Sequence, residues 1–295
     1  MSETNGSIQA RTDRDFRILQ LTDFHNDTGD DAAARTYADI RALVQHWQPG
    51  FLAVTGDIWC GDDKPDRGRD LMDRDLSFLG TLGAPWAFTW GNHDYVNQLE
   101  FDAARIAASQ NACMPKGDGR GNFRVGIKCE GRPAWDLYFL NSHREGLWPQ
   151  DLRWLRTESE RIVLERGERT PAIAFFHIPL EQYERARLAG TVHGIAQEEV
   201  LYWGNSADRF DAIRDTGTIR ACFVGHSHVN DFWFEEEGII LTYGRATGHG
   251  GYGADRLPKG AKLIELDPAS GRFAFKTVFP DGSACLTCDP PHHTR

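Results

Sequence analysis

Short apolar runs alternate with longer amphipathic stretches along most of the chain. Within residues 31–48, Ile40, Leu43 and Trp47 recur at the spacing of one buried helix face. The run Phe51–Val54 that follows is continuously apolar, as expected for a strand that is covered on both faces. This alternation of strand and helix predicts a layered α/β domain.

The same reading assigns most of the chain to regular elements. Helices are expected at 31–48, 70–80, 99–109, 151–166 and 207–215. Strands are expected at 16–21, 51–54, 86–89, 122–128, 135–141, 172–176, 220–224, 231–236, 239–243, 262–266 and 272–278. Residues 177–206 show no regular pattern and are expected to be irregular. No repeat or linker divides the chain, so we expect a single domain at 16–280, with flexible segments at 1–15 and 281–295.

Five of the predicted strands are each followed by a short cluster of Asp, Asn or His residues. The clusters are Asp23-Phe-His25, Gly56-Asp57, Gly91-Asn92-His93-Asp94, His177 and Gly225-His226-Ser-His228. Because loops converge at the carboxyl ends of strands in open α/β sheets, we expect these side chains to form one polar site. Taken singly, Asp23 fits a turn or helix cap and His177 fits a core histidine. The recurrence after five apolar strands favours a shared site.

The residue types of these clusters indicate bound metal. Carboxylate, imidazole and amide ligands together suit Mn, Fe or Zn, whereas calcium prefers sites made of oxygen alone. The candidate ligands are too many for one tetrahedral ion, so two ions ~3.5–4 Å apart are expected. An anion must bridge two such cations to offset their repulsion, and Asp57 is the central candidate.

Composition narrows the choice of partners and location. The 295 residues carry a formal charge of −10, which argues against nonspecific binding to nucleic acid or anionic membranes. No apolar run approaches the ~20 residues that span a bilayer, and the polar start lacks the apolar core of a signal peptide. We therefore expect a cytoplasmic protein with reduced cysteines. A zinc site at Cys285 and Cys288 with His292 and His293 competes with a flexible tail, which is favoured.

The ordered clusters resemble the pattern of the calcineurin-like metallophosphoesterase superfamily, which is D-x-H, G-D, G-N-H-[DE], H and G-H-x-H. The match spans residues 16–228, and the segments 225–231 and 242–248 are most similar to its short purple-acid-phosphatase-like branch. The resemblance implies a four-layer α/β/β/α sandwich of two mixed sheets. It also implies a dinuclear metal centre at the strand ends.

The resemblance assigns a role to each motif residue. Asp23, His25 and His228 would hold the first metal, Asp57 would bridge, and Asn92, His177 and His226 would hold the second. His93 would stay unligated beside the substrate, oriented by Asp94. Purple acid phosphatases carry a tyrosine three residues after the bridging aspartate, and a glycine where this chain has His25. Cys60 replaces that tyrosine, so we expect no purple absorption band. We also expect the bound metals to be Mn or a mixed Fe/Mn pair.

The resemblance implies a metal-dependent phosphoric ester hydrolase that acts on a small phosphorylated substrate. A phosphomonoesterase is the first hypothesis, with a hydroxide held by the two metals as nucleophile and His93 as general acid. A phosphodiesterase on cyclic nucleotides or other small diesters shares the same motifs. A non-catalytic scaffold is the third alternative, although no ligand is missing from the sequence.

Substrate contacts are predicted less directly. Asn92 is one candidate, and Arg245 and His249 of the glycine-rich stretch 243–252 are two others, with a solvated surface turn as the alternative. His143 also follows a predicted strand. Trp59 and Trp90 fit either an aromatic rim or the core.

Overall fold

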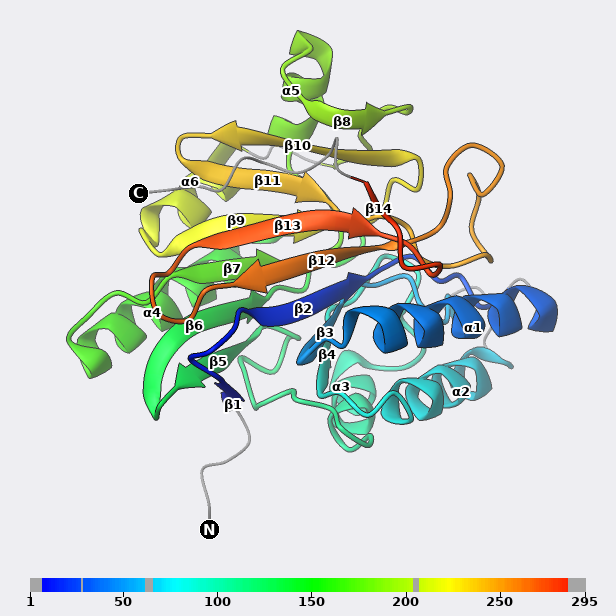
Figure 1. Ribbon diagram of the computed structural model, residues 1–295, viewed down its shortest axis with the longest axis horizontal. Helices are drawn as coiled ribbons and strands as arrows, with labels where there is room; N and C mark the ends of the chain where they lie inside the picture. Colours follow the sequence, from blue (N-terminus) through cyan, green and yellow to red (C-terminus); the bar gives the residue numbers. More distant parts are fainter. Residues whose placement is uncertain (1–6, 28, 62–65, 204–206, 286–295) are drawn as a thin grey trace.

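Two mixed β-sheets pack face to face in the computed structural model, which describes residues 7–27, 29–61, 66–203 and 207–285 (Figure 1). The larger sheet has the order β1 (Ser7–Ala10), β5 (Phe123–Cys129), β6 (Arg132–Phe139), β7 (Ala172–Phe175), β9 (Ile219–Val224), β11 (Ile239–Tyr243), β10 (Asn230–Glu236) and β8 (His193–Ala196). The smaller has the order β14 (Ala284–Cys285), β13 (Phe273–Val278), β12 (Ala261–Leu266), β2 (Phe16–Leu21), β3 (Phe51–Val54) and β4 (Trp86–Phe88).

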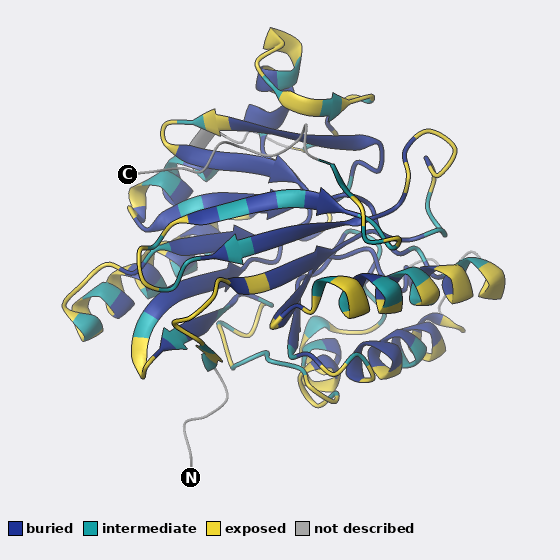
Figure 2. Ribbon diagram, viewed as in Figure 1, coloured by how far each residue is buried: buried dark blue, intermediate teal, exposed yellow. Residues whose placement is uncertain are grey.

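Helices cover the outer face of each sheet. Those on the smaller sheet are α1 (Asp30–Trp47), α2 (Gly68–Gly80) and α3 (Leu99–Ala107). Those on the larger sheet are α4 (Pro149–Arg166), α5 (Glu181–Ala189) and α6 (Ala207–Asp215). Figure 2 shows buried residues along the central strands of both sheets, a largely exposed β8 at one edge, and exposed residues on the outward sides of the helices. The expected four-layer α/β/β/α sandwich is confirmed.

The core between the sheets is rich in aromatic side chains. Phe139 stacks on Phe123 at a centroid distance of 5.0 Å and on Phe175 at 5.1 Å. Phe16 and Phe51 of the smaller sheet belong to the same buried cluster. Full burial of such a side chain contributes roughly 1.5–3 kcal/mol, so this layer holds the two sheets together.

Four short elements differ from the sequence expectations. Residues 177–206, expected to be irregular, contain α5 and β8. The expected flexible segment 1–15 contains β1, which pairs with β5 in parallel. The expected flexible tail contains β14, which pairs with β13. Residues 1–6 and 286–295, the latter including Cys288, His292 and His293, lie outside the described residues, and the single domain stays a prediction.

Strand direction brings the five polar clusters to one side of the sandwich. β2, β3 and β4 are parallel neighbours in the smaller sheet, and β7 and β9 are parallel neighbours in the larger one. Figure 1 shows that the arrows of β2 and β7 point to the same side. Backbone hydrogen bonds tie the loops together beyond the strands, from Asp23 N to Gly56 O (3.0 Å) and from Gly225 N to His177 O (3.1 Å).

Candidate metal centre

Six of the expected ligands form two compact groups, Asp23, His25 and His228 in one and Asp57, His177 and His226 in the other. In each group, one ligand atom per residue lies within 4.8 Å of the others. Asp57 Oδ2 is 3.1 Å from His177 Nε2 and 3.6 Å from His25 Nε2. Asp57 therefore contacts both groups, which is the position that a bridging carboxylate requires.

Three imidazole rings are held through Nδ1 and turn Nε2 toward a carboxylate. The Nδ1 partners are the Thr55 carbonyl oxygen for His177 (2.7 Å), the Tyr252 carbonyl oxygen for His228 (3.3 Å) and Cys60 Sγ for His25 (3.1 Å). Donation from Nδ1–H leaves the Nε2 lone pair for a metal ion. Sequence reasoning missed these partners, because they meet the histidines only through the tertiary fold.

The charges of the site suit a cation. Burial raises the pKa of Asp23, but the hydrogen bond and charge of His228 more than offset it and lower the pKa to about 2. Despite its burial, Asp57 has a pKa well below the usual range because His177 and His25 lie beside it. Burial lowers the pKa of His25 to about 4 and that of His226 to about 3. Charged carboxylates thus lie beside the neutral imidazoles of His25 and His226.

His177 differs from His25 and His226. Burial lowers its pKa, but the charge and hydrogen bond of Asp57 outweigh burial and raise the pKa to about 9. Without a cation, a proton is therefore held between His177 and Asp57. Metal binding would displace this proton.

Asn92 Oδ1 and His226 Nε2 are among the buried polar atoms of the site that have no hydrogen-bond partner in the described ranges. An unsatisfied buried polar atom costs about 1–3 kcal/mol, and coordination to a cation would remove that penalty. The nitrogen, amide and carboxylate donors therefore fit Mn, Fe or Zn.

The backbone of the ligand loops is strained. Asp23, His25, Asp57 and His226 have φ values of 56°, 49°, 54° and 80°, in the left-handed region. They are four of the ten non-glycine residues found with positive φ in the described ranges. Such conformations cost of order 1–3 kcal/mol each and persist only where surrounding contacts impose them.

Close approach of two loops explains the Gly-Asp and Gly-Asn dipeptides. A Cβ atom on Gly56 would lie 2.3 Å from Gly91 N, and one on Gly91 would lie 2.1 Å from Asp57 Oδ1. Gly56 also has a φ of +85°. These contacts leave no room for a larger residue, and they bring the Asn92 loop against the Asp57 carboxylate.

Asp94 holds the ligand loops from behind. Its carboxylate accepts hydrogen bonds from the backbone N–H groups of Asp57 (2.6 Å), Ile58 (2.8 Å) and Gly91 (2.9 Å). Burial and the charge of Asp57 raise the pKa of Asp94 to about 7, while the N–H donors oppose this shift. Orientation of the His93 ring by Asp94 stays a prediction.

His93 belongs to neither ligand group. Its ring centroid lies 5.8 Å from that of His25, and its backbone N–H donates to Asp57 Oδ1 (3.0 Å). The loop that begins at Gly91 therefore places His93 at the centre without using it as a ligand in either group.

Arg245 lies in a buried ion network, and its expected contact with the substrate stays a prediction. The guanidinium is buried and pairs with Asp231, with Nη2 2.5 Å and Nε 2.9 Å from Oδ2. Lys262 Nζ lies 2.6 Å from Asp231 Oδ1. Burial raises the pKa of Asp231, but Lys262 and Arg245 lower it overall. Arg245 therefore stabilises a buried ion network.

Other candidates are engaged by neighbours. His249 Nε2 lies 2.7 Å from Asp39 Oδ2 on α1, while its Nδ1 is buried without a hydrogen-bond partner in the described ranges, and a substrate contact stays a prediction. His143 Nε2 lies 2.9 Å from Asp151 Oδ2. Trp59 and Trp90 are fully buried, so both belong to the core.

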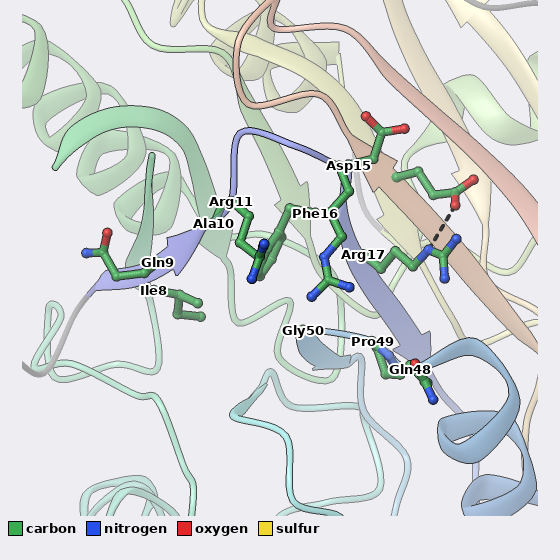
Figure 3. A pocket seen from close by; sticks show the side chains of 12 residues that line it. Ile8, Gln9, Ala10, Arg11, Asp15, Phe16, Arg17, Gln48, Pro49 and Gly50 are labelled. Carbon is green, nitrogen blue, oxygen red and sulfur yellow. Dashed lines mark hydrogen bonds and ion pairs between the residues drawn. The ribbon is translucent and has the colours of Figure 1, made fainter. Parts of the chain in front are cut away.

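A cavity of about 660 Å³ lies at the opposite end of the same strands (Figure 3). Its lining includes Ala10 of β1, Phe16 at the start of β2 and Gly50 just before β3. The expected ligands follow the ends of β2 and β3. This cavity is therefore separate from the metal centre.

The profile of calcineurin-like phosphoesterases matches residues 16–230 of this chain. The chain belongs to the calcineurin-like phosphoesterase family. This match confirms the resemblance drawn from the five clusters, and the family supports metal-dependent hydrolysis of phosphoesters.

Individual relatives agree with this assignment. A protein named probable inactive purple acid phosphatase 28 from Arabidopsis thaliana is 27% identical, over 93% of this chain and 81% of its own length. Phosphatase DCR2 of Saccharomyces cerevisiae is 24% identical, over 80% of this chain and 49% of its own. A dimetal phosphatase structure from Danio rerio shares the fold with a TM-score of 0.64 at 13% identity, covering 94% of this chain and 98% of that one.

Within the described ranges, none of the helices combines the length and apolar character that a membrane crossing requires. The expected cytoplasmic location stays a prediction.

Proposed function

We propose that this chain is a phosphomonoesterase that uses two metal ions of Mn, Fe or Zn. The observation that carries the proposal is that Asp57, a member of one group of three ligands, also contacts His25 of the other group. When bound, two cations supply neutralisation of the phosphoryl oxygens and a water of lowered pKa. The names of the purple acid phosphatase and DCR2 relatives favour a monoester substrate.

Each site residue would have a distinct role in the reaction. Asp57 and the other ligands of the two groups would fix where the phosphoryl group lies. Asn92 would contact a phosphoryl oxygen from the loop that Asp94 holds in place. His93, beside His25, would donate a proton to the leaving oxygen, a contribution of typically 10²–10⁴-fold.

The word inactive in the Arabidopsis relative's name raises the scaffold alternative. The chain described here keeps every expected ligand residue, and six of them meet in the two groups. Charged carboxylates, neutral imidazoles and buried atoms without partners support metal binding, and hence the enzyme.

The decisive experiment compares a monoester with a diester. Metal-stripped protein is reconstituted with Mn, Fe or Zn and assayed on p-nitrophenyl phosphate and bis-p-nitrophenyl phosphate, with Asp57→Asn as the control. We expect faster monoester turnover by the wild type and loss of both metal and turnover in the variant. Faster diester turnover would move the function to a phosphodiesterase, and metal-loaded protein silent on both esters would support the scaffold.

His93→Ala tests the general acid. We expect the variant to keep its metal content and to lose most activity on alkyl phosphates, because their leaving groups need a proton more than nitrophenol does. Equal losses on alkyl and nitrophenyl esters would remove His93 from that role.

A further inference from the structure

Two exposed aromatic side chains contact the two histidines of the Gly225–His228 segment. Trp203 is 39% exposed, and its ring centroid lies 5.2 Å from that of His226 with the planes at 62°. Tyr252 is 50% exposed and stacks on His228 at 4.1 Å with the planes at 13°. Because His226 and His228 belong to different ligand groups, the aromatic side chains stand beside both halves of the centre.

Both aromatic residues are anchored. Tyr252 Oη donates to Glu198 Oε2 (2.8 Å), and Glu198 Oε1 accepts the backbone N–H of Val229 (3.0 Å). The Trp203 carbonyl oxygen accepts a hydrogen bond from Arg209 Nη1 (2.7 Å). The Tyr252 ring is therefore held by its own hydroxyl and the Trp203 backbone by Arg209, and a ring that is held in place loses little conformational freedom when a ligand packs against it, which favours binding.

Each ring keeps exposed surface beyond its contact with a histidine. His228 covers one face of Tyr252, so the exposed half of that residue is left to the opposite face and the ring edges. Trp203 meets His226 edge to face, an arrangement that leaves much of the indole surface accessible. Planar aromatic ligands stack on such surfaces.

We propose that Trp203 and Tyr252 bind the leaving group of the substrate, and that this group carries a planar aromatic ring. The inference rests on the proposed function, because the phosphate at the metal centre brings the ring within reach of both residues. Aryl phosphates and nucleoside monophosphates share this chemistry. Removal of one stacking partner typically weakens binding by about 1–3 kcal/mol, so we expect Kd to rise roughly tenfold when one aromatic residue is removed.

The test compares two non-hydrolysable ligands that differ by the ring. Phenylphosphonate and methylphosphonate are titrated into the full chain loaded with Mn, and Kd is measured by calorimetry. The wild type should bind phenylphosphonate about tenfold more tightly than methylphosphonate. Trp203→Ala and Tyr252→Leu should each reduce this ratio to within about twofold, and Trp203→Phe should restore most of it.

Trp148→Ala is the matched control, because Trp148 is a similarly exposed tryptophan (41%) that stacks on His143. This variant should keep the wild-type ratio of the two Kd values. Equal wild-type affinities for the two phosphonates would overturn the inference, as would an unchanged ratio in both Trp203→Ala and Tyr252→Leu.

A parallel assay of p-nitrophenyl phosphate hydrolysis separates this inference from the proposed function. Hydrolysis without a preference for phenylphosphonate would overturn the aromatic site and leave the hydrolase standing. A preference without hydrolysis of any ester would support the aromatic site and overturn the enzyme. Failure to bind either phosphonate would overturn the aromatic site.

Discussion

Asp94→Asn tests whether the carboxylate behind the centre holds the ligand loops. The carboxylate accepts three buried backbone N–H groups, from Asp57, Ile58 and Gly91. Asparagine has the same shape but only one acceptor oxygen. If that oxygen serves Asp57 and Gly91, the amide NH₂ group faces the N–H of Ile58. Loss of one hydrogen bond together with an unsatisfied donor costs about 2–4 kcal/mol, and removal of the charge that burial and Asp57 disfavour offsets part of this cost.

The effect should concentrate at the metal centre, because the displaced loops carry Asp57 and Asn92. We expect Mn affinity to fall about 10–100-fold, the usual range for residues that support metal ligands. Calorimetric titration with Mn measures the affinity, and urea unfolding measures the loss of stability in the metal-free protein.

Asp102→Asn is the matched control. Asp102 is also buried, and it accepts the backbone N–H groups of Val96 (3.2 Å) and Asn97 (2.9 Å) near the start of α3. Loss of the Asp102 carboxylate should reduce the stability of the fold. The Mn affinity should stay within about twofold of the wild-type value, because neither Val96 nor Asn97 is an expected ligand. Wild-type Mn affinity in Asp94→Asn would refute the reasoning. Equal Mn losses in the two variants would show a global effect instead.

Cys60→Ala removes the Nδ1 partner of His25. Mn binding, measured by calorimetry, should weaken about tenfold. An unchanged affinity would count against a role of Cys60 in orienting His25. Burial raises the pKa of Asp75 from 3.8 to about 6, so its contribution to stability is greatest below pH ~4 and declines as pH rises through 6. Asp75→Asn should therefore gain about 3 kcal/mol relative to wild type between pH 4 and pH 7.5 in urea unfolding, and a pH-independent difference would refute this. Arg245→Met leaves the buried Asp231 with one fewer cation and should cost about 3–5 kcal/mol. Its KM for p-nitrophenyl phosphate should stay within twofold, whereas a large rise in KM would support the substrate contact of Arg245.

The sequence allowed prediction of the ligands because each follows an apolar run. A buried parallel strand such as Phe51–Val54 is recognisable from composition, and its carboxyl end gives the position of Asp57. Glu181–Ala189 was missed because two of its four buried residues, Gln182 and Glu184, are polar, so the sequence shows no apolar helix face. β1 was missed because a four-residue edge strand depends on its partner β5.

The network around Arg245 could have been found from one signal. Asp231 and Lys262 are opposite charges inside runs that otherwise predict buried strands, and buried charges need partners. The contacts of Cys60, Trp203 and Tyr252 had no such signal, because each depends on the packing of loops far apart in sequence.

The strain at the ligand loops bears on the scaffold alternative. Asp23, His25, Asp57 and His226 occupy backbone conformations that glycine would adopt without penalty. The same loops bury two charged carboxylates and leave Asn92 Oδ1 without a partner among the described residues. The left-handed backbone and the unpaired Asn92 Oδ1 lower the stability of the metal-free fold, and a protein that needed only the sandwich would be more stable without them. The two carboxylates are already compensated by histidines, which lower their pKa values. Bound cations would offset the strain and coordinate the unpaired atom, so the local geometry favours the metal-binding hypothesis over the scaffold.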